Sequence, residues 1–428
     1  MLSGDVGNGL HSFAAKLYPI CRSITGDGIR QTLNVIGERI PLQQSNVPSG
    51  AHVFDWIVPK EWNIRDAYIK SLDGKRVVDF RDSNLHVLNY SMPVKARMTL
   101  SDLRPHLFTI AERPEWIPYR TSYYKEDWGF CLSHDQLLSM KDAEYDVCID
   151  SSLESGNLTY GECYLAGKTN EEVLVSCHAC HPSLANDNLS GIAVATFLAK
   201  LLSLCEHRYS YRFLFIPGTI GAITWLARNQ AGAQRIRHGL VLTCVGDSGG
   251  FHYKKSRRGN AEIDRAVAHA LKHQNEPSEV LEFSPYGYDE RQYCSPGFDL
   301  PVGCLMRSVW GTFPEYHTSA DNLEFIKPEK LAGSLRLCAE VVAILENNRS
   351  YRTLNPFCEP QLGRRGLYRS TGGETIAEEI NARLWVLNLS DGTNSLLDIA
   401  ERSGIKFSKI YDAAQLLEQS ELLSKGAE

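Results

Sequence analysis

Residues 176–191 read SCHACHPSLANDNLSG, and this stretch decides the fold class of the chain. It starts at the end of the apolar run EEVLVSCH, which is typical of a short buried strand, and continues into LSGIAVATFLAKLLSLCE, which has the apolar spacing of a helix. Strand-like and helix-like segments then alternate as far as residue 348: YRFLFIPG, AITWLARNQ, GLVLTCVGD, NAEIDRAVAHALKHQ, LPVGCLMRS and KPEKLAGSLRLCAEVVAILENN. Such alternation predicts an α/β domain with a mostly parallel sheet flanked by helices, and functional side chains just beyond the carboxyl ends of its strands.

The length and composition of the chain indicate a globular protein with more than one domain. It has 428 residues, of which 43% are hydrophobic and 22% are charged. The net charge is −6, so the concentrated positive charge of a surface for nucleic acid or membrane is missing. No run approaches the roughly 18 apolar residues of a membrane helix, and the N-terminus does not resemble a signal peptide. We therefore expect a soluble cytoplasmic protein with neither partner, whose 12 cysteines are mostly buried, reduced thiols.

Changes of pattern along the chain predict three domains, of which residues 1–55 and 136–353 form the α/β domain. The segment 56–135 begins WIVPKEWNIRDAYIKSLDGKRVVDF, and its aromatic, strand-like and turn-rich pattern predicts a small β-rich insertion. Its aromatic-dense part, YRTSYYKEDWGF, is expected to form either a small core of its own or a lid over a site. Beyond the insertion, YDVCIDSSLESGNLTYGECYLAG is expected to form a β-hairpin.

Residues 354–428 form the third predicted domain. A stretch rich in proline and glycine at 354–373 is typical of a linker, and SLLDIAERSGIKFSKIYDAAQLLEQSELLS beyond it predicts the helix–turn–helix of a winged-helix domain. From 374 to 428 there are five Lys or Arg and ten Asp or Glu residues, a net charge of −5. Because phosphate binding needs concentrated cations, we expect this domain to serve packing or homo-oligomer formation more than DNA binding.

The opening stretch carries residue types that bind metal ions. His178 directly follows the predicted strand, and Asp187 precedes the predicted helix, with Asn188 as its expected N-cap. This places an imidazole and a carboxylate, both ordinary zinc ligands, at one edge of the sheet. We prefer His178 over His181 as the ligand because it directly follows the strand, and His181 and Cys180 could orient the ligands. A turn that only caps the helix is the alternative, and a thiol site is disfavoured because no second cysteine pair has zinc-ribbon spacing.

Two further segments end near predicted strand tips. Asp247 follows the apolar strand in GLVLTCVGD, and His317 lies in TFPEYHTSADNLEFI. Together with His178 and Asp187 they make a predicted set of four metal ligands at four strand ends. Each of the two has an alternative: Asp247 would be a turn residue, and His317 would be a loop imidazole that hydrogen-bonds Asp321.

The motifs NDNLSG and YHTSAD, which occur in that order, resemble those of the co-catalytic zinc aminopeptidases, a group that includes glutaminyl cyclases. This resemblance covers about 150–350 and implies a metal-bridging Asp187, with His178, Asp247 and His317 as further ligands. Over nearly the full length, the chain is similar to a family of aminopeptidase-like proteins that carry a small inserted domain and a C-terminal winged helix and are associated with polysaccharide biosynthesis. DWIVPKEWNIRDAYI, SCHACHPSLANDNLSG and YCSPGFDLPVG look like motifs of that family.

The chain departs from the zinc aminopeptidase pattern in FIPGTIGAITWL. A Glu-Glu pair is expected there as general base and metal ligand, but Gly218 and Thr219 occupy the two positions. Water attack on an amide needs a proton acceptor, and a second metal ion needs its carboxylate. Three outcomes are open: one metal ion held by His178, Asp187 and Asp247, another acid in place of the pair, or a binding pocket without catalysis.

The segment YGYDERQYCSPGF offers a replacement acid. Glu290 is the predicted acid or base, and Arg291 is predicted to hold a substrate carboxylate. The substrate pocket is predicted to contain four further residues, namely Asp289, Tyr286, Tyr316 and His181. The alternatives are a weak surface ion cluster for the charged residues and core packing for the two tyrosines.

Taken together, these features predict a metal-dependent hydrolase that acts on an amide of a small peptide-like or aminoacyl substrate and holds one or two zinc ions. A catalytically degenerate binding or regulatory protein, with or without metal, is the first alternative, because the Glu-Glu pair is missing. A DNA-binding regulator that works through the winged helix is the second alternative, and the acidic charge of that domain disfavours it.

Overall fold

The structure of the chain, a computed structural model, describes residues 5–367 and 378–426. The chain divides into two compact units: residues up to 261 with 278–336, and residues 262–277 with 337–428. The part of the predicted linker at 368–373 lies outside the described residues. The boundaries of the three domains expected from the sequence stay a prediction.

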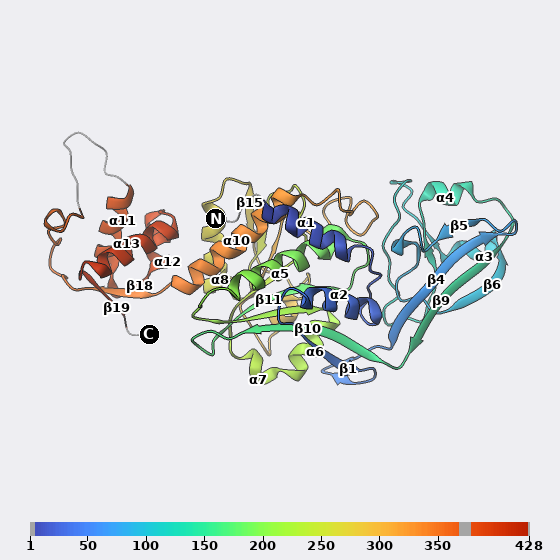
Figure 1. Ribbon diagram of the computed structural model, residues 1–428, viewed down its shortest axis with the longest axis horizontal. Helices are drawn as coiled ribbons and strands as arrows, with labels where there is room; N and C mark the ends of the chain where they lie inside the picture. The colour runs from blue at the N-terminus through green and yellow to red at the C-terminus, as the bar shows by residue number, and fades with distance from the viewer. Residues whose placement is uncertain (1–4, 368–377, 427–428) are drawn as a thin grey trace. The chain divides into compact units, whose positions relative to one another are not determined.

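An eight-stranded sheet forms the centre of the first unit (Figure 1). Its strand order is β1-β10-β12-β11-β13-β16-β14-β15. Strands β12, β11, β13 and β16 run parallel, whereas β1, β10 and β14 pair antiparallel with their inner neighbours. This is the predicted α/β sheet, with a mixed edge on each side. Its strands are β1 (Gln43–Pro48), β10 (Asn157–Leu165), β11 (Glu172–His178), β12 (Ser210–Ile216), β13 (Ile236–Leu242), β14 (Phe251–Lys254), β15 (Ser278–Leu281) and β16 (Val302–Met306).

Helices cover both faces of this sheet, with α1, α2 and α5 on one side and α6 and α7 on the other (Figure 1). Helix α5 is apolar along most of its length and packs on β11, β12 and β13, as the sequence predicts. Gly191 at its start is needed there, because a Cβ would lie 2.4 Å from the backbone oxygen of Leu242. The helices are α1 (Asp5–Leu17), α2 (Asp27–Gly37), α5 (Gly191–Leu202), α6 (Ile220–Arg228), α7 (Gln230–Ala233) and α9 (Glu290–Tyr293), with the irregular turn η3 (Ala185–Ser190) before α5.

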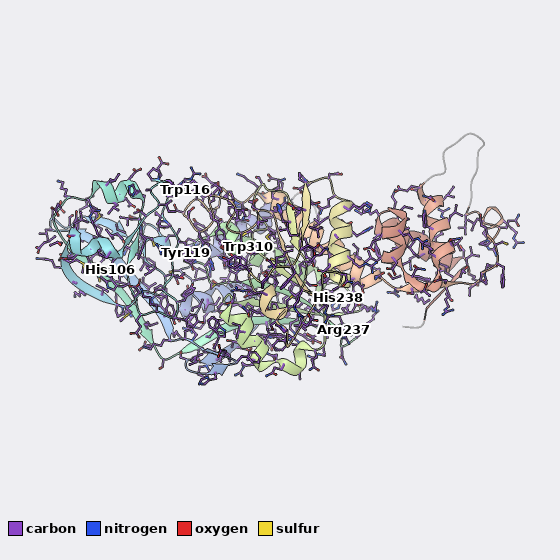
Figure 2. The ribbon with its side chains drawn as sticks, turned by 180° about the vertical axis from the view of Figure 1, so that it is seen from behind. His106, Trp116, Tyr119, Arg237, His238 and Trp310 are labelled. Carbon is purple, nitrogen blue, oxygen red and sulfur yellow. The ribbon has the colours of Figure 1, made fainter. Side chains whose placement is uncertain are left out.

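The inserted part of the first unit contains a second, antiparallel sheet of order β5-β4-β9-β6. Strand β9 lies in this sheet while β10, the next strand along the chain, lies in the large one, so the predicted hairpin at 145–167 is wrong. Tyr119 lies where the inserted part adjoins the α/β part (Figure 2). The elements are β2 (His52–Val53), β3 (Trp56–Ile57), β4 (Glu61–Ser71), β5 (Arg76–Asp79), η1 (Asn84–His86), β6 (Val94–Thr99), α3 (Leu100–Leu103), η2 (Arg104–His106), β7 (Leu107–Phe108), β8 (Phe130–Cys131), α4 (His134–Ser139) and β9 (Glu144–Glu154).

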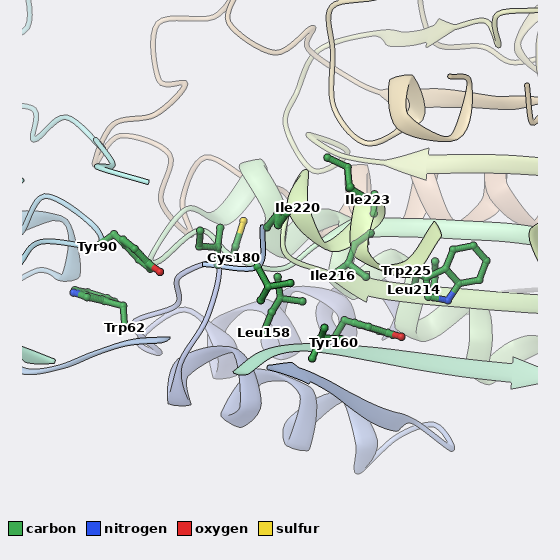
Figure 3. Close-up of a cluster of buried hydrophobic side chains, with 14 of the residues drawn as sticks. Trp62, Tyr90, Leu158, Tyr160, Cys180, Leu214, Ile216, Ile220, Ile223 and Trp225 are labelled. Carbon is green, nitrogen blue, oxygen red and sulfur yellow. The ribbon is translucent and has the colours of Figure 1, made fainter. Parts of the chain in front are cut away.

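One hydrophobic core runs through both parts of the first unit. Trp62 and Tyr90 of the inserted part belong to the same buried cluster as Cys180, Ile216 and Trp225 of the α/β part (Figure 3). The expectation that the insertion has a core of its own is therefore wrong. The insertion is fixed to the sheet by packing, which makes it part of the surroundings of any site at that edge.

Three helices between residues 378 and 419 of the second unit combine with a small antiparallel sheet of order β18-β17-β19, an arrangement typical of a winged helix. The predicted helix–turn–helix is present: Gly404, at a φ of 72°, ends α12 in the left-handed conformation, and Ser395 begins that helix with a capping box. Its elements are α8 (Glu262–Lys272), β17 (Ser350–Thr353), η4 (Gly363–Arg365), α11 (Glu378–Leu389), β18 (Asp391–Ser395), α12 (Leu396–Ser403), α13 (Phe407–Gln419) and β19 (Leu423–Lys425). Helix α10 (Pro328–Asn347) begins in the first unit and ends in the second.

Two expectations about the whole chain can be compared with its described part. All 12 cysteines are free thiols and eight of them are buried, as the lack of framework spacing predicts. Among the helices of the described ranges, none is both long and apolar enough to cross a membrane.

Candidate metal centre

Two loops at the carboxyl ends of the parallel strands bring three of the predicted ligands together. His178 is the last residue of β11, and Asp187 lies in η3, the turn that joins β11 to α5. His317 comes from the long loop after β16 and has a φ of 56°. The predicted histidine–aspartate arrangement at this edge of the sheet is therefore present in the fold.

The histidines all point their ring nitrogens at the carboxylate of Asp187. Nε2 of His178 lies 3.0 Å from Oδ1, and Nε2 of His317 lies 2.9 Å from Oδ2. Nε2 of His181 lies 3.7 Å from Oδ2, so His178 and His181 both face the carboxylate and both are candidate ligands. Four ligands at zinc-bond lengths of about 2.0–2.1 Å around a tetrahedral ion stand about 3.3 Å from one another. The observed spacings are close to that value.

These short contacts do not have the geometry of hydrogen bonds. Nε2 of His178, Nε2 of His317 and Oδ2 of Asp187 are all buried and have no hydrogen-bond partner. In the described part of the chain, the ligand atoms of His178, His181 and Asp187 lie within 4.8 Å of one another. Imidazole nitrogens and a carboxylate oxygen that face one another without hydrogen bonds are a donor set that fits zinc.

The electrostatics of the centre also favour a cation. Burial alone would raise the pKa of Asp187, but the three imidazoles around it hold that pKa well below its usual range. Asp247, Asp289 and Asp321 are buried nearby, at most 1% exposed. None of the four carboxylates has an ion pair with a described Lys or Arg. Buried carboxylates without a cation are costly unless other groups neutralise them.

Asp247 holds the loop of Asp187 and does not point at the histidines. Its Oδ2 accepts a hydrogen bond from the Asn186 amide at 2.7 Å, and its Oδ1 accepts one from the Ser308 hydroxyl at 2.6 Å. Backbone N–H groups of Gly249 and Ser308 complete its shell. Because both oxygens are occupied, the geometry argues against the predicted role of Asp247 as a metal ligand.

Asp321 supports the same loop from the other side. Its two oxygens accept the backbone N–H groups of Asn186 at 2.6 Å and Asp187 at 2.9 Å. It is therefore not the partner of His317, and that alternative is wrong. Asn188 does not cap α5, because its side-chain amide donates to the backbone oxygens of His181 and Asp187 and the helix has no side-chain cap.

A buried acid lies beside the position of the missing Glu-Glu pair. A Cβ at Gly218 would stand 3.1 Å from the Cβ of His178 and 3.8 Å from Oδ1 of Asp289. Asp289 precedes α9, is fully buried, and has no hydrogen-bond partner on either oxygen. Burial, together with the charge of Glu290, raises the pKa of Asp289 to about 8. Asp289, predicted as a pocket residue, therefore has the surroundings of an acid or base.

Glu290 and Arg291 lie in other surroundings than those predicted. Oε1 of Glu290 accepts a hydrogen bond from Nζ of Lys254 at 2.7 Å, and this ion pair is fully buried. The pair is thus no surface cluster, and it argues against Glu290 as a free acid or base. Arg291 has no ion pair with a described acid, and its buried Nε has no hydrogen-bond partner.

Tyrosines surround the centre, and the sequence analysis did not predict the one in closest contact, Tyr288. The hydroxyl of Tyr288 donates to Oδ1 of Asp187 at 2.7 Å and meets the hydroxyl of Tyr316 at 2.8 Å, while its ring stacks on His178. Tyr316 stacks on His317, with ring centroids 4.0 Å apart. Tyr286, the other predicted pocket tyrosine, is 73% exposed. Both tyrosines lie in the motif YGYDERQYCSPGF, two residues apart, and the sequence does not show which of them faces the site.

Comparison with known proteins gives matches over the whole chain. A family model described as "Domain of unknown function (DUF4910)" matches residues 11–348, and a winged helix-turn-helix family model matches residues 349–425. A Clostridium acetobutylicum protein, provisionally named a polysaccharide biosynthesis protein with an aminopeptidase-like domain, is 52% identical over 422 residues. The match covers 98% of this chain and 97% of that protein.

Solved structures show the same architecture. A crystal structure of a protein from Clostridium acetobutylicum, provisionally named a peptidase, has 51% identity and a TM-score of 0.95, and covers 99% of this chain and 97% of that one. A zinc aminopeptidase from Bacillus subtilis has 13% identity and a TM-score of 0.55, with coverage of 79% and 94%. A peptidase M28 precursor from Shewanella amazonensis has 14% identity and a TM-score of 0.56, with coverage of 80% and 93%. At such identities the last two show the fold alone.

Proposed function

Since the chain belongs to the family described as "Domain of unknown function (DUF4910)" and carries a C-terminal winged helix, we propose that it is a metal-dependent hydrolase. The substrate would be a small peptide-like or aminoacyl compound, cleaved at an amide bond. The observation that carries the proposal is the convergence of three imidazoles on Asp187 among buried carboxylates that lack a cation. The peptidase fold and the aminopeptidase-like domain in the name of the 52% identical relative support this proposal. The same name suggests that the substrate belongs to polysaccharide biosynthesis.

His178, His317 and Asp187 are the proposed ligands, with His181 as the fourth donor. A bound zinc ion would polarise the scissile carbonyl and lower the pKa of a water molecule. The hydroxyl of Tyr288 fixes the orientation of the Asp187 carboxylate, since it donates to Oδ1, the oxygen that His178 faces, and leaves Oδ2 to His317 and His181. We assign no ligand role to Asp247, which holds the loop.

Asp289, in place of Glu290, is the proposed acceptor of the proton that amide hydrolysis releases from water. Gly218, which has no side chain, lies between Oδ1 of Asp289 and the side chain of His178. A pKa raised to about 8 by burial suits a group that exchanges a proton near neutral pH. Arg291, with its unpartnered Nε, stays the proposed contact for a substrate carboxylate.

The first experiment is elemental analysis of untagged protein purified without chelator. We expect about one zinc ion per chain in the wild type, and loss of zinc in Asp187→Asn and His317→Ala. The exposed residues Asp55 and His52 supply matched controls, Asp55→Asn and His52→Ala, which should keep the metal. Zinc-loaded protein is then offered aminoacyl p-nitroanilides and amide-linked amino sugars.

A second candidate, a binding protein that has lost catalysis, is favoured by one observation, the glycine and threonine at 218–219. The same experiment separates the two. Zinc binding without hydrolysis of any offered amide would favour the binding protein. Absence of zinc after incubation with excess metal would remove the hydrolase proposal altogether.

A role in DNA binding is disfavoured by the charges of the winged helix. Lys409 of α13, the helix in the recognition position, is paired with Glu378, and Lys406 just before it pairs with Glu340 at 2.8 Å. We propose instead that this unit serves packing or homo-oligomer formation. We also propose a cytoplasmic location, in keeping with 12 free cysteines.

A further inference from the structure

One extended segment of the inserted part is joined to the loop that carries His317. The backbone N–H of Tyr119 donates to the His317 carbonyl at 2.7 Å, and the backbone N–H of Ser319 donates to the Ile117 carbonyl at 2.8 Å. In return, the backbone N–H of Ile117 donates to the Ser319 hydroxyl at 2.9 Å. The two segments thus form an antiparallel bridge. A loop of the α/β part is held by residues about 200 positions away in the chain.

The side chain of Tyr119 lies against two of the three histidines. Its ring centroid is 4.9 Å from that of His181 and 5.1 Å from that of His317, and the latter pair is edge-to-face. The side chain is 6% exposed, and Figure 2 shows Tyr119 between the inserted part and the α/β part. Among the described residues, the hydrogen-bond partner of its hydroxyl is a phenol of the same segment, Tyr123, at 3.1 Å. The ring, and not the hydroxyl, therefore makes the contact with the centre.

His317 needs such support for its own backbone. Its φ of 56° lies in the left-handed region, which is unfavourable for a residue other than glycine. The side chain is 34% exposed and comes from a loop, and the ring of Tyr316 stacks on one of its faces. The bridge and the Tyr119 ring are what the inserted part adds to keep this imidazole turned toward Asp187.

His181 is also tied to the inserted part. Its carbonyl accepts a hydrogen bond from Nε of the fully buried Arg22 at 3.0 Å. The carbonyl of Arg22 in turn accepts the side-chain amide of Asn89, a residue of the inserted part, at 2.9 Å. Two independent sets of contacts thus lead from the insertion to two histidines.

We propose that Tyr119 is a positioning residue of the metal centre, which orients His317 and His181, so that the inserted part completes a site whose ligands all belong to the α/β part. This inference rests on the proposed metal binding. It gives the insertion a function beyond that of a lid, because the site would be incomplete without it. Groups that orient metal ligands commonly change metal affinity by about 10–100-fold when they are removed.

The test compares Tyr119→Leu with Tyr119→Phe in the full-length protein. Zinc affinity is measured by competition with a chelating dye, and the ligand geometry by the visible absorption of the cobalt-substituted protein. We expect Tyr119→Leu to weaken zinc binding about 10–100-fold and to change the cobalt spectrum, because leucine cannot support both imidazoles. Tyr119→Phe keeps the ring, and its affinity should stay within about threefold of the wild type.

Two controls separate positioning from general packing. Tyr123→Phe removes the same phenol–phenol contact as Tyr119→Phe without touching a histidine, and it should leave affinity and spectrum unchanged. Tyr145→Leu removes a buried tyrosine, 3% exposed, from the sheet of the inserted part, and it should lower thermal stability without a change in the spectrum. If Tyr119→Leu does not fold, Ser319→Ala, which deletes one hydrogen bond of the bridge, should still weaken zinc binding several-fold.

Wild-type affinity in Tyr119→Leu, or in Ser319→Ala where that variant replaces it, would overturn the inference. An effect of Tyr145→Leu on the cobalt spectrum as large as that of Tyr119→Leu would do the same, because packing alone would then explain the result. Failure of the wild type itself to bind zinc would remove the proposed function first, so the two failures are distinguishable.

Discussion

Replacement of Asp289 by asparagine should stabilise the metal-free protein, and increasingly so as the pH rises. The carboxyl is fully buried without a hydrogen-bond partner, and burial, together with the charge of Glu290, raises its pKa to about 8. In the unfolded chain the pKa of an aspartate is about 3.9. Between these two values the folded state holds a proton that the unfolded state has released. The free energy of unfolding of the wild type therefore falls as the pH increases.

The size of the effect follows from the two pKa values. Each pH unit between about 4 and 8 lowers the free energy of unfolding by about 1.4 kcal/mol. From pH 5 to pH 8 the wild type should lose about 4 kcal/mol relative to a variant with no titrating group at position 289. The asparagine amide also lacks partners there, at a cost of about 1–3 kcal/mol. That cost is the same at pH 5 and pH 8, so it cancels when the stability difference between variant and wild type at pH 5 is subtracted from that at pH 8.

The assay is urea unfolding of chelator-treated protein at pH 5 and pH 8, followed by tryptophan fluorescence. Six of the seven tryptophans lie in the first unit, so the signal reports mainly the unit that contains Asp289. The exposed variant Asp55→Asn serves as the control and should show no such pH dependence. If Asp289→Asn differs from the wild type by the same amount at both pH values, Asp289 does not carry a raised pKa and the argument for its role as proton acceptor fails.

Three further variants test other buried features. Lys254→Met should lower the free energy of unfolding by about 3–5 kcal/mol in the urea assay, because it leaves the carboxylate of Glu290 buried without its cation. Adding Glu290→Leu to this variant should restore much of the lost free energy of unfolding. Burial lowers the pKa of His269 to about 4, and its Nε2 accepts the backbone N–H of Phe407 at 2.9 Å. Because the unfolded chain takes up this proton at about pH 6.5, the free energy of unfolding should fall between about pH 6.5 and 4. His269→Gln should therefore reduce the acid destabilisation, by at most about 3 kcal/mol, in thermal unfolding of the full chain. Gly191→Ala should cost about 1–3 kcal/mol by calorimetry, because its Cβ would lie 2.4 Å from a backbone oxygen of β13 and α5 would have to shift.

The parallel core of the fold could be predicted because its signal is local. Strands β11 and β12 are buried at every position, so they appear as continuous apolar runs, and each is followed by a helix with clear spacing. The predicted hairpin at 145–167 was wrong because its pairing is not local. Strands β9 and β10 are consecutive, but their partners lie far away in the chain, and a local pattern contains no information about that pairing.

The site was predictable to the level of residue type and strand end, but not of side-chain partner. His178, Asp187 and His317 could be found because histidines and an aspartate follow strands whose ends meet. Asp247 also follows a strand, yet its partners are Asn186 and Ser308, and nothing in the sequence distinguishes a carboxylate that faces the histidines from one that holds the loop of Asp187. Tyr119 had no signal at all, because its position depends on how the insertion packs.

The charges of the centre indicate why one metal ion would suffice. A Glu-Glu pair at positions 218–219 would add two negative charges, whereas the glycine and threonine there add none. Asp247 is neutralised in part by four hydrogen-bond donors, and burial raises the pKa of both Asp289 and Asp321 to about 8, so less negative charge gathers around the histidines than four ordinary aspartates would supply. Among the described residues, Asp187 is the carboxylate that lies within ion-pair distance of the three histidines, and positions 218–219 offer no carboxylate to a second divalent ion. The absence of a Glu-Glu pair at 218–219 and the raised pKa of Asp289 therefore act in the same sense, since both reduce the negative charge that the centre must balance.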